Sequence, residues 1–537
     1  MRFRFLFALS LAAVVRAQSP VTVSTTSGKL QGVEQNGIMS FKGIRFAESP
    51  TGVLRWAPPV TFVSNATQDA TTLSPSCVQQ FAFATAEFIE FLFNNPQDPP
   101  VESEDCLFLN VWAPSPASNV KKPVLFWIYG GSLAFGTASV PAYDGASITS
   151  NQDIVVVTIN YRTNVFGFPG TPDLPPAANN LGFLDQELAL SWVQQNIAQF
   201  GGDPNKITIM VDLLFLPNYA HTHYFPSYQG ESAGAESVSG LVVRHPVNPP
   251  FRAAVLFSGS AADAVELPTA FDAFNNFSIA VGCTEVPGPL RLACLRNVST
   301  AQIRAYTNGP SSGAFGPLID DFTIFSNNLE RIRTGITARV PILTGNLQND
   351  GTLFTLGESD LSAFLVSSGL GAISPDFVRA LYPGQNDTNV IADSFRDSVF
   401  LCPASLWAEA FFQSGMLDVF RYEYGAVFAD LQLFPNAGAW HSSELPEFFG
   451  TFNASTATPD EVTLSKTFQT VIANFVKNPT QSPAPNWPKY IPGPFTKTLA
   501  RLGYNGNVDL NNVVQAVTSD SQDTPCTSLW NAFLDPA

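Results

Sequence analysis

The pentapeptide Gly230-Glu231-Ser232-Ala233-Gly234 gives the clearest indication of the fold. A G-x-S-x-G sequence is typical of a tight turn between a strand and a helix that exposes the serine hydroxyl, and its glycines avoid the clashes that a Cβ would cause. The short β-branched run Ile207–Met210 lies upstream as a strand candidate. The pattern also arises by chance in a chain of 537 residues, so the surrounding sequence decides its meaning.

Alternating strand and helix patterns surround this pentapeptide. Pro123–Tyr129 and Ile154–Ile159 are apolar, largely β-branched runs that predict buried strands, and Leu181–Phe200 has the apolar spacing of a helix. Strands that alternate with helices favour a large, mostly parallel central sheet flanked by helices. No repeat or low-complexity tract divides residues 18–537, so we expect one α/β domain.

The composition excludes several classes of function. Lys and Arg number 27 against 44 Asp and Glu, so the net charge of −17 argues against binding to nucleic acid or to an anionic membrane surface. A hydrophobic content of 45% excludes an intrinsically disordered chain. The sequence contains no P-loop, dinucleotide fingerprint or CxxC pair, so we expect no cofactor and no metal.

The N-terminus predicts export. Arg2 and Arg4 precede the apolar stretch Phe5–Val15, and Val15-Arg16-Ala17 resembles a cleavage site, so residues 1–17 are expected to be a signal peptide of a secreted, extracellular protein. Six cysteines then suggest three disulfides, for which the spacing leaves fifteen pairings open. The expected glycosylation sites are the sequon residues Asn65, Asn276, Asn297, Asn386 and Asn453.

Two longer segments carry a family resemblance. They are Glu104-Asp-Cys-Leu-Phe-Leu-Asn-Val-Trp-Ala-Pro114 and Phe200-Gly-Gly-Asp-Pro-Asn-Lys-Ile-Thr-Ile-Met210. Together with the pentapeptide they resemble the type-B carboxylesterase family, which includes cholinesterases and large fungal lipases, and the likeness extends from Gly43–Ala47 to the region of His441. The resemblance implies the α/β-hydrolase fold and a serine carboxylic-ester hydrolase that forms an acyl-enzyme.

The resemblance also implies a catalytic set. Ser232 matches the family's nucleophile, Asp350 in Asn349–Phe354 matches the acid, and His441 matches the base. The family usually has Glu at the acid position, so the shorter Asp350 requires a small shift of the backbone or of His441. The order serine, acid, histidine is that of α/β-hydrolases.

Chemistry and elimination favour the same base. A serine hydroxyl needs a base to take its proton, an imidazole suits that role, and a carboxylate orients the imidazole. Of the four histidines, His221 and His223 lie in an anomalous segment described below, and His245 lies in a proline-rich, probable surface loop. A lone histidine is usually structural, but the segment that follows His441 resembles the family's, which favours a catalytic role.

The resemblance implies an oxyanion hole and a pairing of the cysteines. Tyr129-Gly130-Gly131-Ser132 follows a predicted strand and is similar to the family's glycine-rich loop, so the N–H groups of Gly131, Ser132 and Ala233 are expected to bind the developing oxyanion. The implied disulfides are Cys77–Cys106, Cys283–Cys294 and Cys402–Cys526.

The first disulfide loop indicates the kind of ester. It lacks the Trp that choline-binding members place there, which disfavours a cholinesterase. Instead it contains Phe81–Phe93, where Phe81, Ala84, Phe88, Phe91 and Leu92 share one helical face. In similar fungal lipases this loop is a mobile lid, so we expect apolar esters as substrates and contact with a lipid interface through this segment. An ordinary amphipathic helix packed on the core is the alternative.

Residues 211–229 interrupt the resemblance. Deleting them joins Ile207-Thr-Ile-Met210 directly to Gly230-Glu-Ser-Ala-Gly234, as in the family. The segment begins with Val, whose codons start with GT, and ends with Gln, which CAG encodes, so its ends fit those of a short intron. We therefore expect a retained intron. A chain that carries the segment would be an impaired enzyme or a non-catalytic binding homologue, the alternative function.

Overall fold

The chain is described by a computed structural model over residues 18–81, 86–95, 98–115, 120–211, 233–260, 271–493, 495–503 and 513–535. The expected signal peptide, Ser232 and most of residues 211–229 lie outside this part. Val211 lies inside it, as the last residue of a strand.

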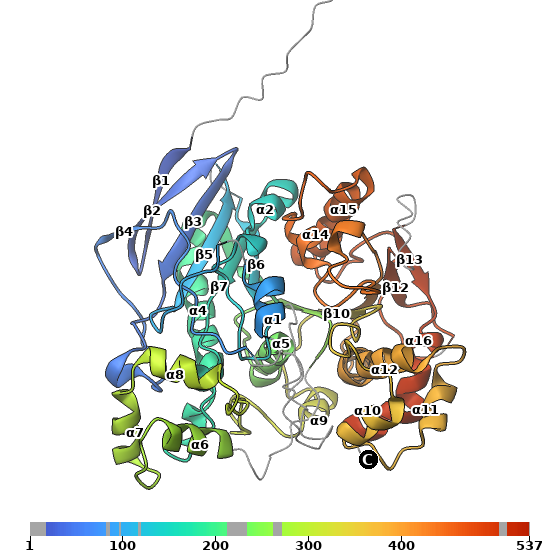
Figure 1. Cartoon of the computed structure of the whole chain (residues 1–537). Helices are drawn as coiled ribbons and strands as arrows, with labels where there is room; N and C mark the ends of the chain where they lie inside the picture. Colours follow the sequence, from blue (N-terminus) through green and yellow to red (C-terminus); the bar gives the residue numbers. More distant parts are fainter. Residues whose placement is uncertain are drawn as a thin grey trace, which may run out of the picture.

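A single large sheet organises the described chain (Figure 1). Its strands are β1 (Ser19–Thr25), β2 (Gly28–Gln35), β3 (Ile38–Arg45), β4 (Thr67–Asp69), β5 (Phe108–Pro114), β6 (Lys122–Ile128), β7 (Val155–Ile159), β8 (Gly202–Val211), β9 (Ala253–Phe257), β10 (Ile342–Leu347), β11 (Val419–Tyr424), β12 (Leu499–Leu502) and β13 (Val514–Val517).

The order across the sheet is β1-β2-β3-β5-β7-β6-β8-β9-β10-β11-β12-β13, and β4 pairs with β2. The strands from β7 to β12 run parallel, whereas β1, β2, β3, β5 and β7 pair antiparallel, as do β12 and β13. The sheet is therefore mixed, with a long parallel centre, and the expected α/β-hydrolase fold is confirmed.

Helices flank this sheet. They are α1 (Ala86–Phe93), α2 (Ala146–Gln152), α3 (Asn164–Gly167), α4 (Leu181–Asn196), α5 (Ala233–Arg244), α6 (Asp272–Ala280), α7 (Pro289–Arg296), α8 (Thr300–Thr307), α9 (Asn328–Arg333), α10 (Leu361–Ser367), α11 (Pro375–Leu381), α12 (Asp387–Arg396), α13 (Cys402–Gln413), α14 (Leu445–Phe449), α15 (Pro459–Lys477), α16 (Asp520–Pro525) and α17 (Asn531–Leu534). Within the described ranges, none of them combines the length and apolarity needed to cross a membrane.

The core explains the apolar strand sequences. Every residue of β7, β9, β10 and β11 is buried, because helices cover the sheet. One group of helices, α2, α14 and α15, packs together against β3 and β5–β8, and α5 and α13 pack against β6 and β8–β11. The two predicted strands are β6 and β7, and the predicted helix is α4 followed by a 3₁₀ turn that ends at Phe200.

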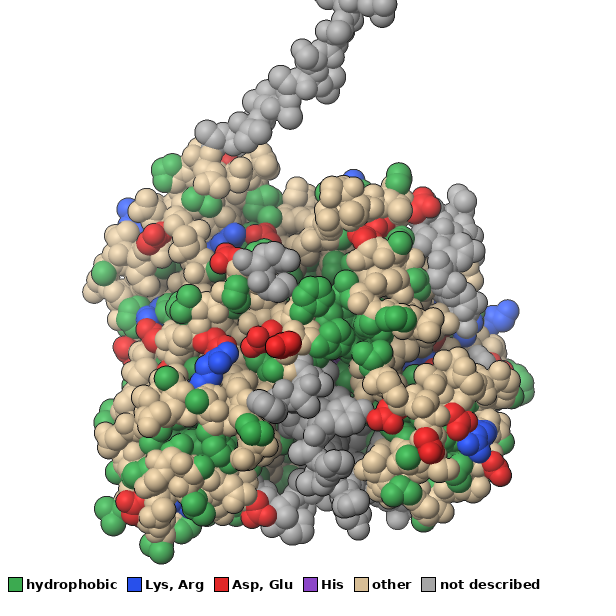
Figure 2. Space-filling view, viewed as in Figure 1, with side chains coloured by type: hydrophobic (Ala, Val, Ile, Leu, Met, Phe, Trp, Pro, Cys, Tyr) green, Lys and Arg blue, Asp and Glu red, His purple; other side chains and the backbone are tan. Residues whose placement is uncertain are grey.

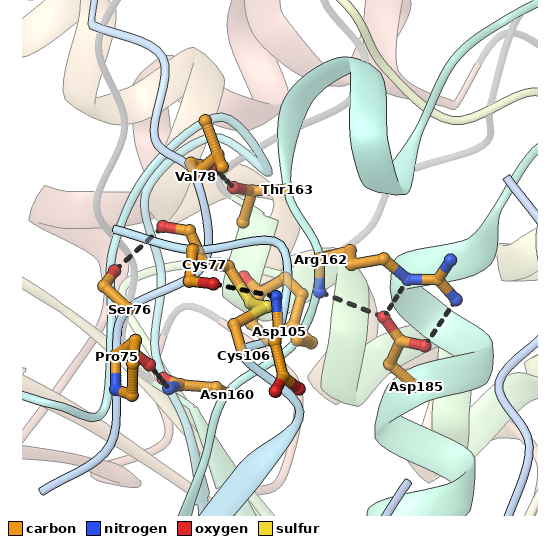
Figure 3. The surroundings of a disulfide bond; sticks show 12 residues. Pro75, Ser76, Cys77, Val78, Asp105, Cys106, Asn160, Arg162, Thr163 and Asp185 are labelled. Atoms are coloured by element: carbon orange, nitrogen blue, oxygen red, sulfur yellow. Dashed lines mark hydrogen bonds and ion pairs between the residues drawn. A yellow bond between two sulfur atoms is a disulfide. The ribbon is translucent and has the colours of Figure 1, made fainter. Parts of the chain in front are cut away.

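Three disulfides join the cysteines in the pairs that the resemblance implies: Cys77–Cys106, Cys283–Cys294 and Cys402–Cys526. The first closes the segment that carries α1 (Figure 3), and both of its cysteines are buried. Next to it, Thr163 Oγ1 donates to the carbonyl of Val78 at 3.0 Å. This contact and the disulfide fix both ends of the α1 segment to the body of the fold.

A buried ion pair stabilises the same region. The Arg162 guanidinium donates to both carboxylate oxygens of Asp185, at 2.7 and 2.8 Å, and both side chains are almost fully buried (Figure 3). The backbone N–H of Arg162 also donates to Asp185, at 3.0 Å. The Arg162 guanidinium also donates to Ala57 O at 2.9 Å. The buried charges therefore have hydrogen-bond partners that offset the loss of water.

Candidate active site

A histidine and an aspartate meet at the carboxyl end of the parallel strands. Asp350 follows β10, and His441 lies in the loop after β11, which is the parallel neighbour of β10. Nδ1 of His441 lies 2.9 Å from Oδ1 of Asp350, and both residues are fully buried. Loops at the carboxyl ends of strands are where open α/β sheets form their sites.

Asp350 is held by a second contact. Its Oδ2 accepts the backbone N–H of Leu347, the last residue of β10, at 2.7 Å. The carboxylate is therefore bound on both oxygens, one toward the sheet and one toward the imidazole. This arrangement fixes the orientation of the imidazole ring, which is the role that an acid has beside a catalytic histidine.

The loops that carry these two residues are joined by their backbones, which explains how a short Asp reaches the ring. Asn349 donates its N–H to Ala439 O at 3.1 Å, and Ala439 donates its N–H to Asn349 Oδ1 at 3.0 Å. Gly438, at φ +67°, permits this approach, because a Cβ there would lie 2.3 Å from Asn349 Oδ1. The two loops are thus held together beside the Asp350–His441 contact.

Aromatic rings surround the imidazole. Phe400 stacks on it, with ring centroids 4.7 Å apart and planes at 27°, and Phe354 meets it edge-on at 5.0 Å. Nε2 of His441 is buried and has no hydrogen-bond partner among the described residues. The ring is therefore held by one carboxylate and by aromatic packing. No pattern in the sequence pointed to Phe400, because it contacts His441 only through the tertiary fold.

The predicted oxyanion loop has an unusual backbone. Gly131, Ser132 and Leu133 follow β6 with φ values of +117°, +55° and +52°. A Cβ at Gly131 would lie 2.3 Å from the carbonyl oxygen of Phe135, so only glycine fits there. Consecutive left-handed residues are costly and are found where a functional backbone is required. The strain supports an anion-binding turn at this position.

A pair of tyrosines supports the start of this loop. The rings of Tyr129 and Tyr161 stack with centroids 4.4 Å apart, and each hydroxyl donates to the other residue's carbonyl, at 2.8 and 2.9 Å. Both side chains are fully buried. Gly136 packs against Tyr129, where a Cβ would lie 2.5 Å from the ring. The turn is therefore built on a rigid base.

Helix α1 lies between the oxyanion loop and the loop of His441. Phe93 packs against Phe135 of the first loop, at 6.3 Å between ring centroids, and against Trp440 of the second, at 6.5 Å. Phe88 packs against Phe434 at 6.4 Å. Hydrophobic side chains gather around α1 at the centre of this face (Figure 2).

The apolar face of α1 differs from the helical-wheel prediction. Ile89 is its fully buried residue, and Phe88, Leu92 and Phe93 pack beside it, whereas Phe91 is 51% exposed. The prediction placed Phe91 on the shared face and omitted Ile89 and Phe93. Phe81 precedes the helix, and Ala84 lies outside the described residues. The buried face of α1 differs from the predicted one because α1 fills a space between two loops. The periodicity of the helix does not specify the position of that space.

Helix α5 begins at Ala233, the residue after Ser232, and packs against β8 and β9. Ser232 itself, like Gly230 and Glu231, falls outside the described residues. The other histidine of the described part, His245, lies at the end of α5 and contacts Glu187 at 2.9 Å. Burial raises the pKa of Glu187, but Arg244 and His245 lower it to about 2. His245 therefore has a structural partner, as the elimination argument requires.

Buried carboxyl groups lie just after His441. Glu447 in α14 is fully buried, and neither of its oxygens has a hydrogen-bond partner within the described part of the chain. Burial, together with the neighbouring Glu461 and Asp430, raises its pKa well above the usual range. Burial also raises the pKa of Glu461. Burial thus favours the protonated form of both groups.

One group of possible metal ligands lies close together in the described ranges: Cys283, Glu285 and Cys294. Both sulfurs are engaged in the Cys283–Cys294 disulfide, so neither offers a thiolate. The five sequon asparagines are all exposed.

The sheet topology and the histidine–carboxylate pair are those of an α/β-hydrolase. The family model described as "Carboxylesterase family" matches residues 19–213, 227–366 and 383–519. The chain belongs to this carboxylesterase family.

The three relatives below are all named as esterases, and each name gives a different ester. The chain is 31% identical to a chlorogenic acid esterase of Aspergillus niger, over 86% of this chain and 83% of that protein. It is 30% identical to the para-nitrobenzyl esterase of Bacillus subtilis, over 87% and 92%. It is 33% identical to a human cocaine esterase, over 84% and 82%.

Proposed function

We propose that the protein is a secreted serine esterase that hydrolyses apolar carboxylic esters through an acyl-enzyme. Ser232 is the nucleophile, His441 the base and Asp350 the residue that orients it. The observation that carries this proposal is the buried 2.9 Å contact between Asp350 and His441. The position of Ser232 directly before α5 fits a nucleophile at a helix N-terminus.

The reaction follows from these groups. Nε2 of His441 takes the proton of Ser232 Oγ, and the Oγ–carbon bond forms at the ester carbonyl. The N–H groups of Gly131, Ser132 and Ala233 bind the oxyanion. The imidazolium then returns its proton to the leaving alkoxide, the carbon–oxygen bond breaks, and the alcohol departs. Water, deprotonated by the same imidazole, releases the acid and regenerates Ser232.

The walls of the site favour apolar esters. Two small hydrophobic clusters involve α1. In the first, Ile89 of α1 packs with Phe81 and Phe135, and in the second, Phe88, Leu92 and Phe93 of α1 pack against Leu353, Phe434, Ala437 and Trp440. Aromatic and aliphatic walls bind acyl chains by excluding water. We propose glycerides, sterol esters or other long-chain esters as substrates, with α1 as the cover of the site. Hydrolysis rates against acyl length test this, and a strong preference for acetyl over octanoyl esters would contradict it.

Export and glycosylation belong to the same proposal. Three disulfides and five exposed sequon asparagines suit an oxidising, extracellular environment. N-terminal sequencing of the protein recovered from culture medium should give Gln18 as the first residue. Intact protein in the cell fraction, beginning at Met1, would contradict export.

We propose further that residues 211–229 are a retained intron. The family model leaves residues 214–226 unmatched, which supports an interruption inside this segment. Val211 still pairs with Ile128 and Leu256 at the end of β8, so the strand is intact up to the interruption. Sequencing of the mature transcript decides this point.

Labelling with a fluorescent organophosphonate tests the nucleophile. The full chain and the chain without residues 211–229 are both treated, and each is compared with its Ser232→Ala variant. We expect labelling that Ser232→Ala abolishes, at least in the shorter form. If neither form is labelled, the second candidate function, a non-catalytic binding homologue, is favoured. The observation behind this candidate is the interruption that precedes Ser232 in the sequence.

A further inference from the structure

The aromatic ring that stacks on His441 comes from a distorted helix. Helix α12 runs without a break into a π-helical turn at Asp397–Leu401, and α13 follows it. Pro403 has no N–H for the carbonyl of Val399, so the ordinary α-helical ladder is interrupted at this point. π-turns inside α-helices are frequent at functional sites.

This turn delivers Phe400 to the imidazole. Phe400 and His441 are both fully buried, with ring centroids 4.7 Å apart and planes at 27°. Phe354 closes a second side edge-on, at 5.0 Å and 66°. The third ring of the cluster, Phe395, stacks on Phe354 at 5.0 Å and lies 6.1 Å from the Phe400 ring, measured between ring centroids.

The turn is fixed on several sides. The Asp397 carboxylate accepts from Arg396 Nε at 2.7 Å and from the Tyr382 hydroxyl at 2.8 Å. Arg396 also donates to Gln348 O, two residues before Asp350, at 3.0 Å. The disulfide of Cys402 follows directly. The turn is thus tied to the loop of the catalytic acid, and Phe400 has little freedom to move.

We propose that Phe400 is a positioning residue of the esterase, which stacks on the His441 imidazole and stabilises its protonated form through the face of the ring. The proposal rests on the proposed function, in which His441 carries a proton in each half of the reaction. The face of a phenyl ring attracts a cation, most strongly where both are desolvated. The stack also keeps the ring in the plane set by Asp350.

Charged groups in the neighbouring elements are unchanged by the test. They are Asp350 after β10, the Arg396–Asp397 pair of the turn, and Glu444 and Glu447 after His441. Variants of Phe400 remove none of these charges. A shift of the pH profile in Phe400 variants that a variant of another ring in the cluster does not show therefore reports the ring that stacks on His441.

The experiment compares Phe400→Leu with the matched control Phe395→Leu, which removes a ring from the same cluster. For Phe400→Leu we expect kcat to fall about tenfold at constant KM, with the acidic limb of the kcat/KM profile moved down by roughly half a pH unit, as loss of a buried cation–π contact implies. For Phe395→Leu we expect an unmoved limb. Phe400→Tyr, which keeps a ring, should restore the limb.

Equal limbs in the Phe400→Leu and Phe395→Leu variants would overturn the proposal. If Phe400→Leu does not fold, Phe400→Met fills the space without a ring and gives the same readout. NMR titration of the His441 ring in the full chain reports the shift even without turnover. Failure of the proposed function is seen separately, as phosphonate labelling that survives Ser232→Ala.

Discussion

Asp350 Oδ1 lies 2.9 Å from His441 Nδ1, although the two residues are 91 positions apart, and both side chains are fully buried. The contact exists because β10 and β11 are parallel neighbours. The loops that follow them therefore both begin at the carboxyl ends of these strands, on the same side of the sheet. The joined backbones of Asn349 and Ala439 then bring an aspartate within reach where the family usually has the longer glutamate.

Replacing the acid tests the role of this contact. In Asp350→Asn the amide cannot both orient the imidazole and stabilise its charge, so kcat should fall on the order of 10³- to 10⁴-fold with little change in KM. Steady-state kinetics on a soluble ester measures this. Asp350→Glu is the companion variant: the extra methylene has no free space in a fully buried site, so partial activity is expected. Full activity in Asp350→Asn would remove Asp350 from the mechanism.

The close approach of the two loops depends on Gly438. A Cβ there would lie 2.3 Å from Asn349 Oδ1, so Gly438→Ala should separate the loops and lower kcat/KM roughly 100-fold, because ångström shifts matter at such sites. Gly357 is the matched control, since its φ is also positive, +90°, but nothing lies within 4 Å of its Cβ position. Gly357→Ala should lower the free energy of unfolding by about 1 kcal/mol and leave kcat/KM unchanged.

Helix α1 should act through Phe93. Phe93→Ala removes the ring between Phe135 and Trp440, so kcat/KM for octanoyl esters should fall about tenfold, and less for acetyl esters. Phe91→Ala serves as the control on soluble esters, because the Phe91 side chain is 51% exposed to solvent. A loss in Phe91→Ala confined to emulsified esters would indicate contact with a lipid interface. Equal losses in both variants on soluble esters would contradict the assigned packing.

Stability should depend on the buried acids. Burial raises the folded-state pKa of Glu447, so its stabilising contribution is complete below the unfolded pKa of about 4.5 and is lost as the pH rises toward the folded value. Burial also raises the pKa of Asp397 to about 6, although Arg396 lowers it, which gives the same sign. The free energy of unfolding should therefore decline from pH 4.5 to neutrality.

Glu447→Gln should make this decline shallower between pH 4.5 and 7, because the amide does not titrate. Chemical denaturation at several pH values measures the slope. Glu285→Gln is the control, because Glu285 is exposed. An unchanged slope in Glu447→Gln would mean that Glu447 does not titrate differently in the folded and unfolded states.

The sequence by itself determined the family and the α/β class, and its motifs predict the catalytic residues. It could do so because a buried parallel strand must be apolar throughout, and because the turn that carries the nucleophile admits few residues besides glycine. Each of these features is a run of consecutive residues, so the sequence alone is enough to recognise it. The glycine loop after β6 was predicted as part of the site from such a motif, but its strained backbone at Gly131 and Ser132 became visible only in the structure.

Only the tertiary structure decided the surroundings of His441. Phe354 and Phe400 are far from His441 in the chain, and both pack against its imidazole ring. In α1, Ile89 and Phe93 pack inward, where the sequence predicted Phe91. No local pattern encodes such contacts. A helical period fixes which residues share a face, but the space between the loops around Phe135 and Trp440 fixes which face is buried.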